Sequence, residues 1–126
     1  MINTQKHIEY WRQGVDEDFE VAQQLIRSNK IRHGLFFLHL SLEKILKAHI
    51  CSHSNDIAPR LHNLIRLSEL SGITVESEQT DFLSEMNLFN IEGRYPELWG
   101  VVPSQKEAEM FLNKTEEVLK WLSNLL

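Results

Sequence analysis

The chain is poor in the residues that cross-link a fold or interrupt its helices. Among 126 residues there are only one cysteine, 3 prolines and 5 glycines. The single cysteine, Cys51, excludes an internal disulfide, and we therefore expect the reducing environment of the cytoplasm. Because glycine and proline are the strongest breakers of regular structure, their scarcity predicts long, uninterrupted elements.

Long apolar runs and positive charge are also scarce. No apolar run reaches the roughly 18 residues that suggest a membrane-spanning helix, and the polar segment 1–7 is unlike a signal peptide. We therefore expect no membrane association. The net charge of -5 disfavours broad electrostatic binding to nucleic acid, while a local basic groove stays open as an alternative.

The motifs of common cofactor and metal sites are missing. The sequence holds no P-loop, no dinucleotide fingerprint, no Cys-x-x-Cys pair and no His-Glu-x-x-His. His49 and His53 have the i,i+4 spacing of metal ligands, but zinc sites commonly use four ligands and no second pair accompanies them. The sequence therefore predicts no metal and no cofactor.

What the sequence does contain is helical periodicity. A helix over about residues 4–29 is predicted by one apolar stripe, made of Ile8, Trp11, Val15, Phe19, Ala22, Leu25 and Ile26. Residues 31–52 are apolar over much of the helix circumference, which is typical of a helix that packs against several neighbours. We expect this second helix to be the central one.

Three further helices are expected in the second half. Pro59 suits the first turn of a short helix that ends near Leu70, with Gly72 as a left-handed cap. Another helix is predicted over 76–92, followed by a loop over 94–102. Ser104 and Glu107 form a capping box before a final helix. Residues 1–126 are thus predicted to be one all-α domain, an antiparallel up-and-down four-helix bundle with an additional short helix.

Three sequence blocks resemble those of the HEPN family, the higher eukaryotes and prokaryotes nucleotide-binding domain. The first, residues 37–48, ends in Glu43-Lys44-Ile45-Leu46-Lys47-Ala48. The second is Pro59-x-x-His62-Asn63-Leu64, with asparagine where the family usually has aspartate. The third runs from Asn87 to Arg94-Tyr95-Pro96, with glycine replacing alanine before the arginine. The blocks occur in the family's order and at its approximate spacing.

The resemblance implies a helical bundle that commonly forms a homodimer. Wide apolar stripes that include Phe36, Phe37 and Trp121 favour the same assembly. Many such domains act with a separate minimal nucleotidyltransferase, often as toxin and antitoxin. Some are metal-independent RNases with an Arg-x(4–6)-His motif, and others are noncatalytic subunits that bind nucleotides.

The chain departs from the RNase pattern after Arg94. No histidine occurs in the seven residues that follow it. The resemblance therefore favours Arg94 and Tyr95 as ligand-binding residues, with the guanidinium on a phosphate and the ring on a base. The alternative is that Arg94 pairs with Glu92 or Glu97 and that Tyr95 only shapes the loop.

The other candidate ligand-binding residues lie in the three blocks and near them. They are His39, Lys44, Lys47, His62 and Asn90. Glu43, four residues after His39, could orient its imidazole, although a buried structural histidine is favoured. Lys44 and Lys47 could bind a phosphate or lie solvated along apolar surface. His62 could bind an anion at the start of a helix or simply cap that helix.

Three functions stay open from the sequence. The first is a noncatalytic HEPN protein that binds a nucleotide, RNA or another phosphate-bearing ligand and acts with a separate nucleotidyltransferase. The chain lacks a nucleotidyltransferase signature of its own. The second is an RNase toxin with a divergent site, in which Arg94 works with His39 or His62. The third is a structural or scaffolding helical dimer.

Overall fold

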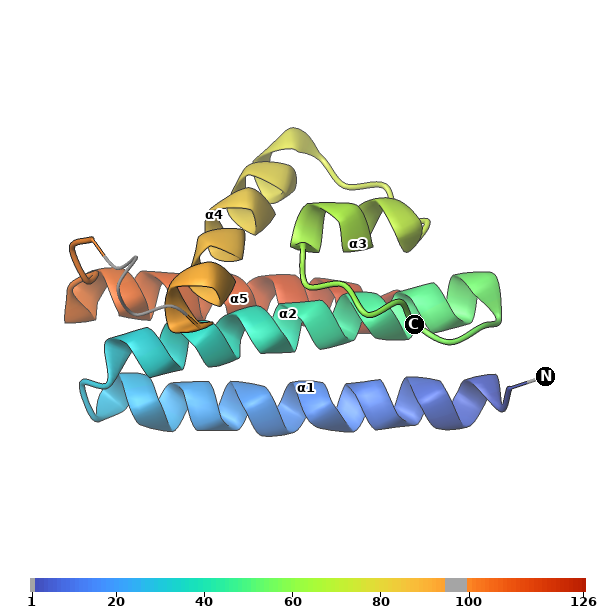
Figure 1. The fold of residues 1–126 in the computed structure, drawn as a ribbon, viewed down its shortest axis with the longest axis horizontal. Helices are drawn as coiled ribbons and strands as arrows, with labels where there is room; N and C mark the ends of the chain where they lie inside the picture. Colours follow the sequence, from blue (N-terminus) through green and yellow to red (C-terminus); the bar gives the residue numbers. More distant parts are fainter. Residues whose placement is uncertain (1, 95–99) are drawn as a thin grey trace.

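A computed structural model describes the backbone of residues 2–94 and 100–126, and the side chains of residues 2–90 and 100–126. Within these residues the chain forms five helices and no strand (Figure 1). The helices are α1 (Thr4–Arg27), α2 (Ile31–Ser54), α3 (Leu64–Leu70), α4 (Ser77–Arg94) and α5 (Gln105–Asn124). The predicted all-α class and helical bundle are confirmed.

Helix α2 is the centre of the molecule, as its composition predicts. It packs against each of the other four helices. Long α1 and α5 run alongside it, while α4 crosses it obliquely and α3 lies over its C-terminal half (Figure 1). Leu35, Leu38 and Leu42 on α2 are fully buried. The central helix therefore supplies a larger share of the core than any other helix and also carries polar side chains into it.

Helix ends are fixed by the residues that satisfy free backbone groups. The side chains of Asn3 and Asn63 cap α1 and α3. Ser104 and Glu107 form the predicted reciprocal capping box at α5. After α3 the chain turns at Gly72, whose φ of 76° is the left-handed conformation predicted for it.

The predicted start of the third helix is wrong by about one turn. Pro59 and Leu61 precede the helix instead of belonging to it, and His62 also lies outside. The helix begins at Leu64 because Asn63 accepts hydrogen bonds from the amides of Ile65 and Arg66. The amide of Leu64 is bound by Asn87 of α4, a tertiary contact that local sequence does not reveal.

Other boundaries differ by one or two residues. Helix α1 ends at Arg27 instead of about residue 29, and α2 extends to Ser54. Helix α4 continues through Gly93 to Arg94, which was predicted to begin a loop. No helix in the described part of the chain is both long enough and apolar enough to span a bilayer.

Candidate functional site

A polar cluster centred on Glu43 lies where α2 meets the segment before α3. Glu43 is only 4% exposed. Its Oε2 atom lies 3.0 Å from Nζ of Lys47, and its Oε1 atom lies 3.0 Å from Nδ1 of His62. A carboxylate accepts and does not donate, so both partners donate to it. These two bonds offset the cost of burying the charge.

His62 is the accessible member of the cluster. Its side chain is 50% exposed, whereas that of Glu43 is 6% exposed. Because Nδ1–H donates to Glu43, Nε2 is the nitrogen left to face a ligand or water. A buried carboxylate that holds one imidazole nitrogen fixes both the tautomer and the orientation of the ring. The arrangement thus presents an oriented imidazole at the surface.

His39 lies in the same cluster but is closed off from solvent. It is fully buried, and its Nδ1 atom lies 3.9 Å from Oε1 of Glu43. Neither ring nitrogen makes a hydrogen bond of normal geometry to any described residue. Burial lowers the pKa of His39 to about 4, although the nearby Glu43 charge opposes this shift. The imidazole is therefore neutral at pH 7.

Helix α4 is bound to the segment before α3 through Asn87. The side-chain oxygen of Asn87 accepts a 2.7 Å hydrogen bond from the amide of Leu64, and its Nδ2 donates to Oδ1 of Asn63 at 3.1 Å. One helical turn later, Asn90 is 8% exposed, and its Nδ2 has no hydrogen-bond partner among the described residues. Asn87 therefore fixes the start of α3, and with it His62, against α4.

The two candidate lysines do not converge on one ligand position. Lys47 is buried between Glu43 and the ring of Trp11, with Nζ 5.3 Å from the ring centroid. Lys44 instead crosses α1 at Gly14 and binds Asp18 at 2.7 Å. A Cβ atom at residue 14 would lie 2.8 Å from Cδ of Lys44, so the glycine allows this crossing. Both ammonium groups already have acidic partners.

Arg94 is the last residue of α4, seven positions after Asn87. At a rise of about 1.5 Å per residue, its backbone is about 10 Å further along the helix axis. The side chain of Arg94 and all of Tyr95 lie outside the described residues. Arg94 and Tyr95 therefore stay predicted ligand contacts.

The remaining histidines of α2 lie elsewhere. Nε2 of His49 lies 2.7 Å from the Leu122 carbonyl, to which it donates, and the ring of His53 lies against Gly72. Among residues 2–90 and 100–126, no three histidine, cysteine, aspartate or glutamate side chains gather as metal ligands would. Cys51 is buried, and burial raises the pKa of its thiol.

Sequence reasoning singled out His39 and His62 separately and missed what connects them. Glu43 was considered only as a group that could orient His39, with a buried structural histidine favoured, and its oxygen lies closer to His62. Asn87 and Trp11 were not among the candidates. One sequence feature could have pointed to Asn87, because this polar residue stands beside apolar Met86 in an inward-facing part of α4. The i,i+4 spacing of Glu43 and Lys47 was a second such feature.

Comparison with protein families identifies the class of this domain. A family model described as "HEPN domain" matches residues 8–125, which is nearly the whole chain. The chain belongs to the HEPN family, a family of nucleotide-binding and RNase-type domains. The resemblance of the three sequence blocks is confirmed.

A solved structure has the same fold. The crystal structure of TT1696 from Thermus thermophilus superposes with a TM-score of 0.80 at 17% sequence identity, covering 94% of this chain and 98% of that chain. At this identity the likeness concerns the fold alone. No curated protein was found to match the chain.

Proposed function

We propose that this HEPN domain binds a nucleotide or another phosphate-bearing ligand where the segment before α3 meets α4, and that it does not cut RNA by itself. The observation that carries the proposal is the Glu43–His62 pair. It holds an oriented imidazole at the surface, 3.0 Å from a buried carboxylate. Arg94, at the end of the adjacent helix, supplies the group suited to a phosphate.

The histidines support binding without cleavage. Metal-free cleavage of RNA needs a group that exchanges a proton near neutral pH, close to the reacting phosphate. His39 is fully buried and has a pKa of about 4, so it does not serve a ligand in this way. His62 is accessible, but the chain two residues after it is bound to α4 at Asn87, two helical turns before Arg94.

The proposed biological setting is cytoplasmic and includes a second protein. Because the sequence lacks a nucleotidyltransferase signature, that activity would come from a separate polypeptide, with the pair acting as toxin and antitoxin. The domain itself would act as a homodimer. This setting rests on the resemblance of the sequence blocks to those of HEPN proteins.

One observation favours a second candidate, a metal-independent RNase with a divergent site. A half-exposed imidazole oriented by a buried carboxylate is an arrangement typical of acid–base catalysis. In that case His62 would exchange the proton and Arg94 would stabilise the phosphate. The two candidates share residues and differ in whether RNA is cleaved.

A titration with labelled AMP separates the alternatives. We expect wild-type protein to bind, and Arg94→Ala and His62→Ala each to weaken binding at least about fivefold, since charge-assisted hydrogen bonds commonly contribute about 1 kcal/mol or more. Arg27→Ala is a matched control because Arg27 also ends a helix, α1. His33→Ala is the control for His62, since His33 is exposed near the start of α2.

The same proteins are incubated with labelled RNA in a metal chelator. Intact RNA together with the expected loss of AMP affinity would support the binding role. Cleavage by wild type that disappears in both Arg94→Ala and His62→Ala would instead establish the RNase alternative. Equal AMP affinity in wild type and all four variants would show that Arg94 and His62 are structural and would refute the proposed site.

A further inference from the structure

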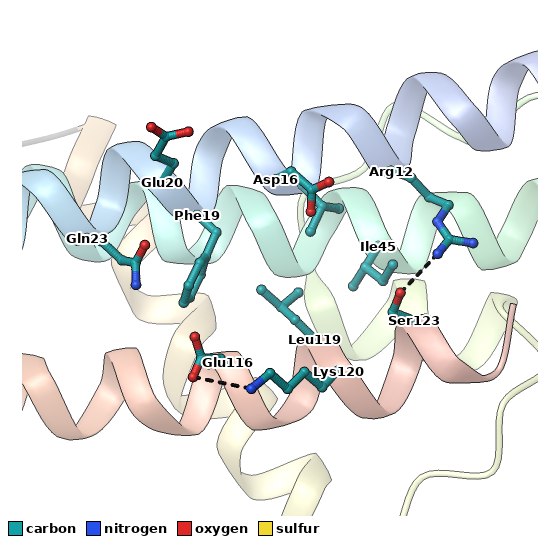
Figure 2. A pocket seen from close by; sticks show the side chains of 11 residues that line it. Arg12, Asp16, Phe19, Glu20, Gln23, Ile45, Glu116, Leu119, Lys120 and Ser123 are labelled. Carbon is teal, nitrogen blue, oxygen red and sulfur yellow. Dashed lines mark hydrogen bonds and ion pairs between the residues drawn. The ribbon is translucent and has the colours of Figure 1, made fainter.

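A groove lies on the other side of α2 from the Glu43–His62 pair. Helices α1 and α5 run antiparallel and are joined near both ends of the pair. Arg12 donates a 3.1 Å hydrogen bond to Ser123, and the side chain of Gln105 donates a 2.9 Å bond to the carbonyl of Ile26. Between these two bonds the helices enclose a groove of about 540 Å³, with Ile45 of α2 at its floor (Figure 2).

The groove has an apolar floor and a charged rim. Its apolar lining consists of Val15, Phe19, Ile45 and Leu119, and Phe19 extends from α1 into the space between the helices (Figure 2). On α1 the lining runs from Arg12 to Gln23, about 16 Å at 1.5 Å per residue. This length matches three turns of a helix, and a shallow apolar channel of this kind suits an amphipathic helix.

The rim carries more negative than positive charge. Lys120 lies 3.7 Å from Glu116, whereas Arg12 keeps its positive charge because its partner, the hydroxyl of Ser123, is neutral. Asp16 and Glu20 also line the groove, but within the described residues neither makes a hydrogen bond or an ion pair. They lie four residues apart, on one face of α1. A partner with basic residues beside its apolar face would complement them.

The groove is separate from the Glu43–His62 site. Ile45 follows Glu43 by two residues, which places the two positions about 200° apart around α2. The groove is lined only by α1, α2 and α5, whereas the polar cluster involves α2, α4 and the segment before α3. Occupation of one surface therefore leaves the other open.

We infer that the α1–α5 groove is a docking surface for an amphipathic helix of a different protein, one that carries lysine or arginine beside its apolar face. The chain itself has a net charge of -5, so a second copy brings more negative charge to a rim that already carries two unpaired carboxylates. Charge complementarity thus favours a basic partner helix over self-association at this surface.

Two synthetic peptides test whether the groove prefers a basic helix. Both are 18-residue, N-acetylated, C-amidated and fluorescently labelled helices with leucine at i, i+3, i+7 and i+10. One carries lysine beside the leucine stripe and the other carries glutamate. We expect the lysine peptide to bind at least about tenfold more tightly at 0.15 M salt, because like charges oppose the glutamate peptide.

Matched double variants locate the binding. The double variant Asp16→Asn, Glu20→Gln should lower the affinity for the lysine peptide about three- to tenfold, since rim charges contribute modestly to affinity. Glu17→Gln with Glu85→Gln removes the same charge at positions that do not line the groove, and should leave affinity within about twofold. Phe19→Ser should weaken binding strongly, with circular dichroism as the check that the variant is folded.

Several outcomes would overturn the inference. If both double variants weaken the lysine peptide equally, the peptide is attracted by the acidic protein in general and not by the groove. If both peptides bind the wild type equally, binding is apolar and does not depend on the charge of the peptide. Sedimentation equilibrium tests whether a second copy of the chain occupies the groove instead. If wild type self-associates and Phe19→Ser abolishes that association while peptides fail to bind, the groove belongs to a second copy of the chain and the basic partner is refuted.

Discussion

Glu43 is the residue on which the polar cluster depends. It is 4% exposed and binds both Lys47 and His62. We expect Glu43→Gln to destabilise the protein by about 3 kcal/mol, because Lys47 would keep its charge in a buried position without a carboxylate partner. Urea unfolding of the two proteins checks this, with Glu69→Gln on the exposed pair Arg66–Glu69 as control. A loss below about 1 kcal/mol for Glu43→Gln would contradict the described pairing.

His39 should make the fold sensitive to mild acid. Its pKa is about 4 in the folded chain and 6.5 in an ordinary setting, so the unfolded chain takes up a proton first as pH falls. Stability is therefore lost between pH 6.5 and 4, by about 2 kcal/mol at pH 5 relative to pH 7.5. Burial also lowers the pKa of His49, which adds in the same direction.

A substitution isolates the contribution of His39. His39→Leu should remove its share of the acid sensitivity, so that the variant loses less stability than wild type between pH 7.5 and pH 5. His7→Leu, on the first turns of α1, provides a control at a histidine outside the cluster. If the free energy of unfolding falls equally with pH in wild type and His39→Leu, His39 is not a neutral, buried group in the folded chain.

At the scale of the elements, α2 holds the bundle together. Leu42 is fully buried on it, whereas Leu88 on α4 is 51% exposed. Leu42→Ala should cost about 2–5 kcal/mol in unfolding free energy, because it removes buried contacts and leaves a cavity. Leu88→Ala should cost less than about 1 kcal/mol, as is usual for exposed positions. Similar losses for both variants in urea unfolding would show that α2 is not central.

The elements were largely predictable from sequence because each long helix has an apolar stripe and its own end signals. Ser104 with Glu107, and Gly72, act through local hydrogen bonds and backbone conformation, and they appear where the pattern placed them. The start of α3 was predictable only in part. Asn63 is a local cap, but the amide of Leu64 is bound by Asn87, which is 23 residues further along, so only the folded chain brings these two together.

The same reason limits what sequence revealed about the site. His62 was a candidate as a helix opener, yet it lies before the helix, and its orientation comes from Glu43, which precedes it by 19 residues and lies on α2. Lys44 and Lys47 are three residues apart in sequence, but one reaches Asp18 and the other Glu43. Residue type and spacing therefore identified several members of the cluster, while its connections required the packing of α2 against its neighbours.

At the scale of the whole molecule, the chain is an acidic HEPN bundle with two separate surfaces. We predict a homodimer, for which light scattering should give twice the 14.8 kDa mass of one chain at micromolar concentration. Phe36, Phe37 and Trp121, which favoured this assembly in the sequence, are half-buried within one chain. A mass of 14.8 kDa across the micromolar range would contradict the dimer.

The most direct test of the proposed function uses the six histidines as internal probes. Long-range ¹H–¹⁵N spectra of the imidazoles are recorded while AMP is added to the wild-type protein. We expect the Nε2 resonance of His62 to shift in a saturable way, while those of His7, His33 and His53, which lie away from the cluster, stay unchanged. A His62 resonance that does not move at AMP saturation, or one that moves no more than the distant histidines, would contradict a ligand site at the Glu43–His62 pair.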